Sequence, residues 1–377
     1  MSAYRLSFRR ALIFANASPR YEINPVTGAV TGPYAAGIPS IVTVGGERYL
    51  QVEAARENLV TYNQALTNGA WSKSDAGDTL TATLDPLGGS TAFLYVPSST
   101  IKSHYIYQSK TSRTLAICAK ASGYGYAFFR TVIAGDRNDI FCNLATGAIT
   151  ELQELGATNH ILYSRSQALA WGGFYFEITL NSDTIYYELG VSNSNSTISF
   201  AGNGTSGAIL WLPQASTSTK YEGSLIATVA SAVTRAKDEG YIPAASVPTA
   251  LKDKGTFSFI TEWSSDQVTT GDLRYLAEFA DTTQNIKIYY NGTDKKIYVY
   301  GASALVASAA TTHSAAQKLT VSYDRASGSI TLSGFTTGNG TYPGTAWDRT
   351  DGNLYVGMDA SLANQIDRCI SELGILS

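Results

Sequence analysis

The sequence has few charged residues and few of the residues that build metal or redox sites. Charged side chains make up 15% of the 377 residues, and the formal net charge is −3. Average soluble proteins carry roughly 25% charged residues, and non-specific nucleic-acid binding requires clustered Lys and Arg. The three cysteines (Cys118, Cys142 and Cys369) and the three histidines lack the spacing of a metal site. We therefore expect no nucleic-acid partner, no cofactor and no assigned metal ligand, with the cysteines acting as small buried hydrophobic residues.

Long apolar runs are also missing. The apolar stretch near the start, Ala11–Ala15, is shorter than the roughly 7–15 residues of a secretory signal core. The longest apolar run, Ala168–Phe176, falls short of the roughly 18 residues that a membrane span requires. These absences predict a chain that is made in the cytoplasm, without a signal peptide and without membrane insertion.

Helical periodicity is nearly absent, whereas strand patterns recur along most of the chain. In Phe174–Thr179, apolar and more polar residues alternate with the period of two of a half-buried strand. Ile286–Tyr290 and Lys296–Tyr300 are joined through Asn291-Gly292, the strongest short signal for a hairpin. Hydrophobic residues, at 44%, are plentiful enough to form cores. The sequence predicts an all-β protein with two tandem β-sandwich or jelly-roll domains.

The passage from Gly207 to Pro243 marks the predicted boundary between these domains. An apolar strand runs into Pro213, a residue that cannot donate to a central ladder, and strand patterns restart at Thr256. The first residues contain few core-forming segments, so we expect them to extend along another subunit or scaffold. The predicted organisation is an N-terminal attachment segment over residues 1–57, a jelly roll over 58–243, a linker over 244–253 and a second sandwich over 254–377.

Two sets of motifs stand out between residues 19 and 240. The first comprises Pro19-Arg20-Tyr21, Pro25-Val26-Thr27-Gly28, Leu50–Tyr62 and Trp71, and the second comprises Leu210–Gln214 with Ser231–Asp238. Through these motifs, the chain resembles tailed-bacteriophage virion proteins. In that family such motifs open and close a carbohydrate-binding-module-like jelly roll. A concanavalin-A-like (laminin-G-like) sandwich often follows it in fibre and head-decoration proteins, and residues 254–377 are similar to such a sandwich. Pro213 departs from the family, which tends to have glycine there.

The resemblance implies a structural, non-enzymatic protein on the virion surface, of the fibre, spike or head-decoration type. The N-terminal segment is then expected to contact other virion proteins of the capsid or tail. The sandwiches are expected to project outward as homotrimers and to bind host cell-surface polysaccharide through many copies. Two alternatives stay open, namely a ligand-free decoration protein that stabilises the capsid and a polysaccharide depolymerase.

Aromatic side chains of the first domain are the candidates for sugar binding. Sugars present apolar C–H faces that stack on aromatic rings, while nearby polar groups bond their hydroxyls. The candidate residues are Tyr105, Tyr107, Tyr124, Tyr126, Arg130, Asp136, Asn138, Tyr175 and Tyr187. A weaker set in the second domain consists of Tyr289, Tyr298 and Tyr300. The alternative is that most of these tyrosines pack the sheets or a subunit interface.

Carboxylates supply two further candidate sites. Glu177 and Glu188 lie in strands one hairpin apart. A glycosidase needs its two carboxyl groups roughly 5–5.5 Å or 6.5–9.5 Å apart, depending on stereochemistry. We expect these two to be solvated outer-face residues without a catalytic role. Asp75, Asp78 and Asp85 cluster beside Gly and Thr without the spacing of a calcium loop, so a structural calcium ion stays an open alternative.

Overall fold

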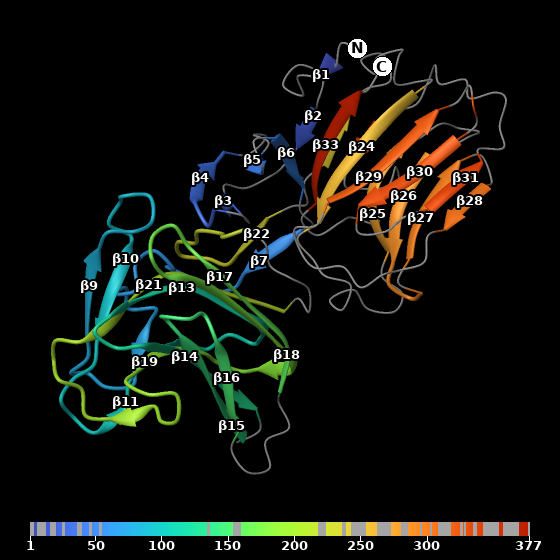
Figure 1. Ribbon diagram of the computed structural model, residues 1–377. Coiled ribbons are helices and arrows are strands. Elements are labelled where there is room, and N and C mark those ends of the chain that lie inside the picture. Colours follow the sequence, from blue (N-terminus) through green and yellow to red (C-terminus); the bar gives the residue numbers. More distant parts are fainter. Residues whose placement is uncertain are drawn as a thin grey trace. The chain divides into compact units, whose positions relative to one another are not determined.

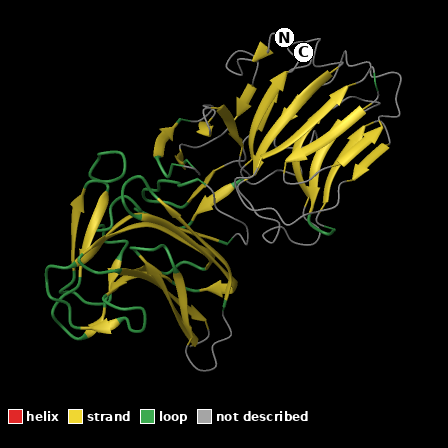
Figure 2. Ribbon diagram, in the orientation of Figure 1, coloured by secondary structure: helices red, strands yellow, loops and turns green. Residues whose placement is uncertain are grey.

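The regular secondary structure of the described residues consists of strands, which loops connect (Figure 2). The computed structural model describes residues 4–5, 13–15, 20–24, 27–35, 40–44, 47–52, 55–133, 136–153, 160–217, 224–235, 239–242, 254–261, 273–279, 286–294, 296–301, 304–307, 318–324, 327, 329–334, 338–341, 354–356 and 369–375. The predicted all-β class is confirmed. Among these residues, no helix has the length and hydropathy of a membrane span.

The chain forms two compact units, each assembled from separate stretches of sequence (Figure 1). The central unit consists of Ser18–Tyr34 and Arg56–Arg235. The terminal unit consists of Met1–Ala17, Ala35–Ala55 and Ala236–Ser377.

This division differs from the predicted one, because residues 1–57 do not stand apart as an attachment segment. A strand without a core of its own is stabilised by pairing with a sheet, and strands of residues 1–57 pair within both units. The central unit ends at Arg235 rather than at residue 243. The predicted linker, 244–253, lies outside the described residues.

Two antiparallel six-stranded sheets form the sandwich of the central unit. Sheet I has the order β17 (Ile161–Ala168), β18 (Phe174–Thr184), β13 (Ser112–Ser122), β21 (Gly207–Ser216), β10 (Ala92–Val96), β9 (Thr79–Thr83). Sheet II has the order β16 (Ile149–Gln153), β15 (Asp136–Asn143), β14 (Tyr126–Ile133), β19 (Tyr187–Ser192), β12 (Tyr105–Gln108), β8 (Ser72–Lys73). Three short ribbons accompany them: β3 (Arg20–Ile23) with β4 (Val30–Tyr34), β7 (Arg56–Asn58) with β22 (Val233–Arg235), and β11 (Lys102–Ser103) with β20 (Ser199–Phe200).

The main core of the central unit lies between sheets I and II. Ile117 and Phe176 of sheet I and Phe129 and Leu189 of sheet II are fully buried members of it. Each such side chain stabilises the fold by roughly 1.5–3 kcal/mol relative to exposure. Because side chains alternate along a strand, the neighbours of these residues point to the outer face of each sheet.

The outer face of sheet I is covered by the N-terminal ribbon β3–β4. Tyr21 packs edge-on against Trp211, with ring centroids 5.5 Å apart, and exchanges two backbone hydrogen bonds with Leu225. Gly28 of the turn lies so close to β17 that a Cβ atom would come within 2.1 Å of the Ala168 carbonyl oxygen. The ribbon therefore forms a second hydrophobic core on this face.

The terminal unit also contains two sheets. The eight-stranded sheet has the order β31 (Gly338–Thr341), β30 (Ser329–Gly334), β29 (Lys318–Asp324), β24 (Lys254–Thr261), β33 (Cys369–Ile375), β6 (Glu47–Val52), β5 (Ser40–Val44), and β1 (Tyr4–Arg5) also pairs with β33. The seven-stranded sheet has the order β2 (Ile13–Ala15), β23 (Glu239–Ile242), β32 (Leu354–Val356), β25 (Leu273–Phe279), β26 (Ile286–Asn291), β27 (Lys296–Gly301), β28 (Ala304–Ala307). N-terminal strands thus contribute to both sheets.

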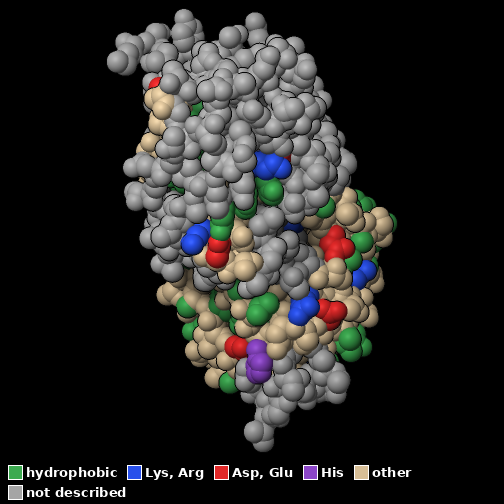
Figure 3. Space-filling view, turned by 90° about the vertical axis from the view of Figure 1, so that its right-hand side faces the viewer, with side chains coloured by type: hydrophobic (Ala, Val, Ile, Leu, Met, Phe, Trp, Pro, Cys, Tyr) green, Lys and Arg blue, Asp and Glu red, His purple; other side chains and the backbone are tan. Residues whose placement is uncertain are grey.

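Two of the predicted structural residues are confirmed as such. Cys118 and Cys142 are free and fully buried, and burial raises the pKa of both thiols, which keeps them protonated. The side chain of Cys369 lies outside the described residues. On the face shown in Figure 3, the described acidic and basic side chains lie interspersed among neutral groups.

Candidate functional site

The outer face of sheet II carries a row of polar residues that crosses four strands. Tyr107 lies opposite Glu188, Glu188 opposite Arg130, and Arg130 opposite Asp139. Directly opposed residues in an antiparallel sheet point to the same side, with Cβ atoms roughly 4.5–5.5 Å apart. These four residues, on β12, β19, β14 and β15, therefore face one another, and we call them the Glu188 row.

An aromatic row runs beside it. Tyr105, Gly190, Phe128 and Phe141 are opposed in the same way. The Phe128 ring crosses over Gly190, where a Cβ atom would lie 2.4 Å from that ring. Ile198 packs on both phenylalanines, which are almost completely buried. The aromatic row thus supports the Glu188 row from one side.

Arg130 is bound to Asp139 within the row. Its Nε donates to Asp139 Oδ1 at 2.8 Å, and its second guanidinium nitrogen donates to Oδ2 at 3.2 Å. Burial by itself would lower the pKa of Arg130, but the hydrogen bond and the charge of Asp139 outweigh it, so the pKa is raised. The guanidinium stays charged, and this two-point contact occupies one edge of its fork.

Glu188 has a buried oxygen atom with unused hydrogen-bonding capacity. Its side chain is only 7% exposed, and no described residue donates a hydrogen bond to its Oε2 atom. Burial raises its pKa to about 7, although the charges of Arg130 and Arg137 act in the opposite direction. A buried polar atom without a partner costs roughly 1–3 kcal/mol, so such an atom calls for an explanation.

Half-buried tyrosines flank the carboxyl group of Glu188. The ring centroids of Tyr105 and Tyr107 are 5.9 Å apart at an interplanar angle of 54°. Those of Tyr107 and Tyr186 are 6.1 Å apart and nearly perpendicular. Burial raises the pKa of Tyr105 and the negative charge of Glu188 adds to this effect, so its hydroxyl remains a hydrogen-bond donor. The row therefore combines aromatic surface, donors and an unpaired acceptor.

The structure brings four of the predicted sugar-binding residues to this face: Tyr105, Tyr107, Tyr126 and Arg130. Tyr124 lies apart from them. It packs edge-on against Phe200 at 5.4 Å, and its hydroxyl accepts a hydrogen bond from the backbone of Asn203 at 3.0 Å.

Three other candidates are buried packing residues. Tyr187 and Asn138 point to the inner side of sheet II, and the Tyr187 hydroxyl donates to the Ala116 carbonyl at 2.9 Å. Tyr175 lies on the covered outer face of sheet I. These predictions were wrong for two reasons. Tyr187 and Asn138 occupy the inward-facing positions of their strands in sheet II, and Tyr175 belongs to sheet I. Asp136 begins β15, but its side chain lies outside the described residues.

Glu177 and Glu188 do not form a carboxylate pair. Glu177 is on β18 of sheet I, Glu188 is on β19 of sheet II, and both point away from the core between the sheets. Glu177 is only 1% exposed and accepts hydrogen bonds from Tyr175 at 2.6 Å and from Arg165 at 3.0 Å. Neither glutamate is the fully solvated residue that the sequence predicted.

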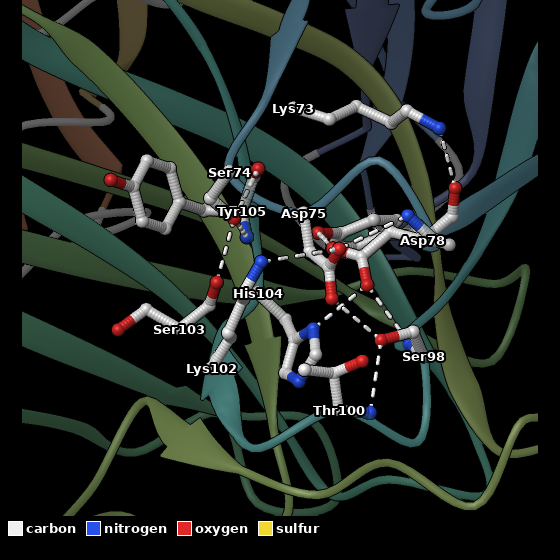
Figure 4. A network of polar contacts seen from close by, with 12 residues as sticks. Lys73, Ser74, Asp75, Asp78, Ser98, Thr100, Lys102, Ser103, His104 and Tyr105 are labelled. Atoms are coloured by element: carbon white, nitrogen blue, oxygen red, sulfur yellow. Dashed lines mark hydrogen bonds and ion pairs between the residues drawn. The ribbon is translucent and has the colours of Figure 1, made fainter.

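Asp75 and Asp78 belong to a hydrogen-bonded network with His104, shown in Figure 4, and their ligand atoms come within 4.8 Å of one another. Asp78 lies 2.8 Å from Nδ1 of His104, and Nε2 of this ring lies 2.9 Å from the Phe200 carbonyl oxygen. Both ring nitrogens thus lie within hydrogen-bond distance of oxygen atoms of the protein.

Asp85 does not join this network. It closes its own turn by accepting hydrogen bonds from the backbone of Leu87, Gly89 and Thr91. The three aspartates that the sequence grouped are therefore split, and the network ties loops of the central unit together.

The tyrosines predicted in the second domain stack on one another. Tyr289 and Tyr298 are opposed on β26 and β27, with ring centroids 5.3 Å apart and nearly parallel planes. Tyr275 stacks on the other side of Tyr289 at 5.0 Å. The ring faces of this ladder are used for packing, and the side chain of Tyr300 lies outside the described residues.

The sequence did not point to Asp139 or Tyr186, nor to the position of Glu188 beside the tyrosines on the outer face of sheet II. One signal was available for Asp139. Ala134-Gly135 between Ile133 and Asp136 has the length of a two-residue hairpin loop, and this register places Arg130 opposite Asp139. The pairing of β12 with β19 joins distant segments, and no local pattern specifies it.

No protein-family model matches this chain. No curated protein matches it either. Among solved structures, the chain is similar to the mouse laminin alpha1 chain, domains LG4-5, with 11% identity, a TM-score of 0.25, and coverage of 80% of this chain and 90% of that chain. The assignment of β-sandwich architecture rests on the strands and their pairing described above.

Proposed function

We propose that this protein is a structural component of a tailed-phage virion whose central unit binds host-surface glycans. The phage origin is supported by the motifs at Pro19–Gly28, Leu50–Tyr62 and Leu210–Gln214, which resemble those of virion proteins. Contact with other virion proteins of the capsid or tail is proposed for strands within residues 1–57. The protein acts without catalysis.

Glycan binding is proposed at the Glu188 row and its flanking tyrosines. The observation that carries this proposal is the unpaired Oε2 atom of Glu188 between half-buried tyrosines on the outer face of a sheet. Sugar recognition requires an aromatic surface for C–H faces and fixed polar atoms for hydroxyls. Tyr105, Tyr107 and Glu188 supply both within one small area.

Single-site binding of this kind is weak, and we propose that copy number compensates. A homotrimer presents three equivalent sites, and a virion presents many trimers, so that the second and later contacts form at high effective concentration. The measured affinity for a surface coated with glycan should therefore exceed that for the free oligosaccharide.

A glycan array probed with the full-length protein tests the proposal. We expect binding to host polysaccharide and a loss of about tenfold or more when Tyr105 and Tyr107 are both changed to Ala. Tyr163→Ala is the matched control, because Tyr163 is a half-buried tyrosine of sheet I. Absence of any binding by the unchanged protein would reject the glycan-binding role and favour the ligand-free decoration protein.

A further inference from the structure

The two charged groups that face each other in the Glu188 row, Arg130 and Glu188, differ in their hydrogen bonds. The guanidinium of Arg130 is held by both oxygens of Asp139, at 2.8 and 3.2 Å. The Oε2 atom of Glu188, directly opposite Arg130 on the next strand, receives no hydrogen bond from any described residue. One edge of the strongest donor in the row is therefore engaged, and the Glu188 acceptor lacks a described partner.

We propose that Glu188 determines ligand class: the site takes a neutral polyhydroxylated sugar ring that donates a hydroxyl hydrogen bond to Glu188 Oε2, and it rejects glycans that present a carboxylate there. This inference rests on the proposed function and adds a specificity to it. The occupant must bring a donor because an acceptor is what the row leaves unpaired.

Rejection of acidic glycans follows from the charges that face the site. Glu188 and Asp139 are acidic, and the charged guanidinium of Arg130 is paired with Asp139. Arg137 lies on the same side of β15, but it is exposed, so solvent and salt screen its attraction. A ligand carboxylate would thus meet the Glu188 carboxylate, while the nearest cation, Arg130, already has Asp139 as its counter-ion.

A hydroxyl-bearing ring is selected by the same atom. A site built to bond a substrate hydroxyl discriminates strongly against analogues that lack the donor, because its buried polar group is then left unpaired. Glu188 is 7% exposed, so bulk water replaces a missing donor poorly. Tyr107 and Tyr105 hold the ring next to this carboxyl group.

The discrimination should depend on pH. The groups that face Glu188 are Tyr105 and Tyr107 from β12, Arg130 from β14, and Arg137 and Asp139 from β15. Burial raises the pKa of Glu188 to about 7. Below this value the carboxyl group is neutral and repels a uronate less, whereas above it the full negative charge is present.

The test uses the full-length protein on surfaces coated with a neutral glucan or with a polyuronate of matched size. At about pH 8.5 we expect binding to the polyuronate to be about tenfold weaker than to the glucan, and this ratio should shrink several-fold at about pH 5.5. Glu188→Gln keeps the side-chain shape, and we expect it to reduce the ratio and to remove its pH dependence. Asp183→Asn is the control, since it removes a negative charge from an exposed position of β18.

The outcomes separate the inference from the proposed function. Tyr105 and Tyr107 substitutions that abolish glucan binding, together with a glucan-to-polyuronate ratio that Glu188→Gln leaves unchanged, would overturn the inference and leave glycan binding standing. Failure of the unchanged protein to bind any glycan would overturn both. An equal melting temperature of Glu188→Gln and the unchanged protein, or a higher one, shows that lost binding is not lost folding.

Discussion

The two outer faces of the central unit carry the same three residue types in different states. On sheet I, Glu177 accepts hydrogen bonds from both Tyr175 and Arg165. On sheet II, Glu188 has Tyr107 and Arg130 as its direct cross-strand neighbours, but Arg130 is bound to Asp139 and Glu188 Oε2 has no described partner.

The β3–β4 ribbon covers the outer face of sheet I and accounts for the complete bonding of Glu177 there. The β3–β4 ribbon lies over that face, where Gln167 donates to the Asn24 carbonyl at 2.8 Å and Ala170 donates to the Gly28 carbonyl at 3.0 Å. Under such a cover a charged group is tolerated only with its partners in place. The same three residue types therefore form a structural cluster on sheet I, where the glutamate accepts hydrogen bonds from the other two, and a candidate binding site on sheet II, where the glutamate lacks a described partner.

The largest expected effect comes from removing the ring on which the ribbon packs. Trp211 is fully buried, donates to Thr91 at 2.9 Å, and contacts Tyr21. We expect Trp211→Ala to lower the free energy of unfolding by about 3–5 kcal/mol in urea denaturation. Tyr107→Ala, on the sheet II face, serves as comparison and should cost clearly less. Equal losses would contradict the distinction between a sealed face and an open one.

A slightly smaller effect is expected from breaking the ion pair on sheet I. Arg165→Met leaves the buried carboxylate of Glu177 without its cation, and we expect a loss of about 3 kcal/mol at neutral pH. Urea denaturation measures this loss, and an unchanged free energy of unfolding would argue against a structural role for the ion pair.

On sheet II, the corresponding residue is Glu188, and we expect its ionised form to lower the free energy of unfolding. The folded-state pKa of Glu188, about 7, lies above its ordinary value of 4.5, so the folded state binds more protons between these values. Its contribution to stability is then lost as pH rises from about 4.5 to about 7. We expect Glu188→Gln to be more stable than the unchanged protein at about pH 8, by on the order of 1–2 kcal/mol, and to match it near pH 4. A variant that is less stable at both pH values would show that Glu188 is a structural residue.

The smallest expected effect on stability comes from making sheet II resemble sheet I. Asp139→Asn weakens the hold on Arg130, which can then bond Glu188 on the neighbouring strand. We expect the pKa of Glu188 to fall below about 7, because a nearby positive charge favours the ionised carboxylate. NMR titration of the glutamate side-chain carbons measures this, and an unchanged or higher pKa would contradict it.

Local patterns in the sequence predicted the strands well, because alternation and turn residues act over a few positions. Tyr105, Tyr107 and Arg130 were named as candidates from residue type alone; the structure places them on one face, and sugar binding there stays a prediction. Tyr187 was misplaced because its side depends on the register of β19 against β12 and β14, which joins distant parts of the chain. Glu177 was misplaced because its cover is formed by residues far upstream.

Membership of the units was the least predictable feature for the same reason. The strand β6 at Glu47–Val52 pairs with β33 at Cys369–Ile375, a contact across almost the whole chain. Nothing near either strand signals this partner. The alternation of hydrophobic residues predicts that each segment is a strand, but it does not predict which sheet the strand joins.

The position of β33 between β24 and β6 has a consequence for synthesis. The segments of the central unit are complete once the ribosome has translated Arg235, so this sandwich is able to fold while translation continues. The eight-stranded sheet, in contrast, is incomplete until Ile375 has been translated, because β33 pairs with both β24 and β6. Until then β1 and β6 remain without this partner in the nascent polypeptide.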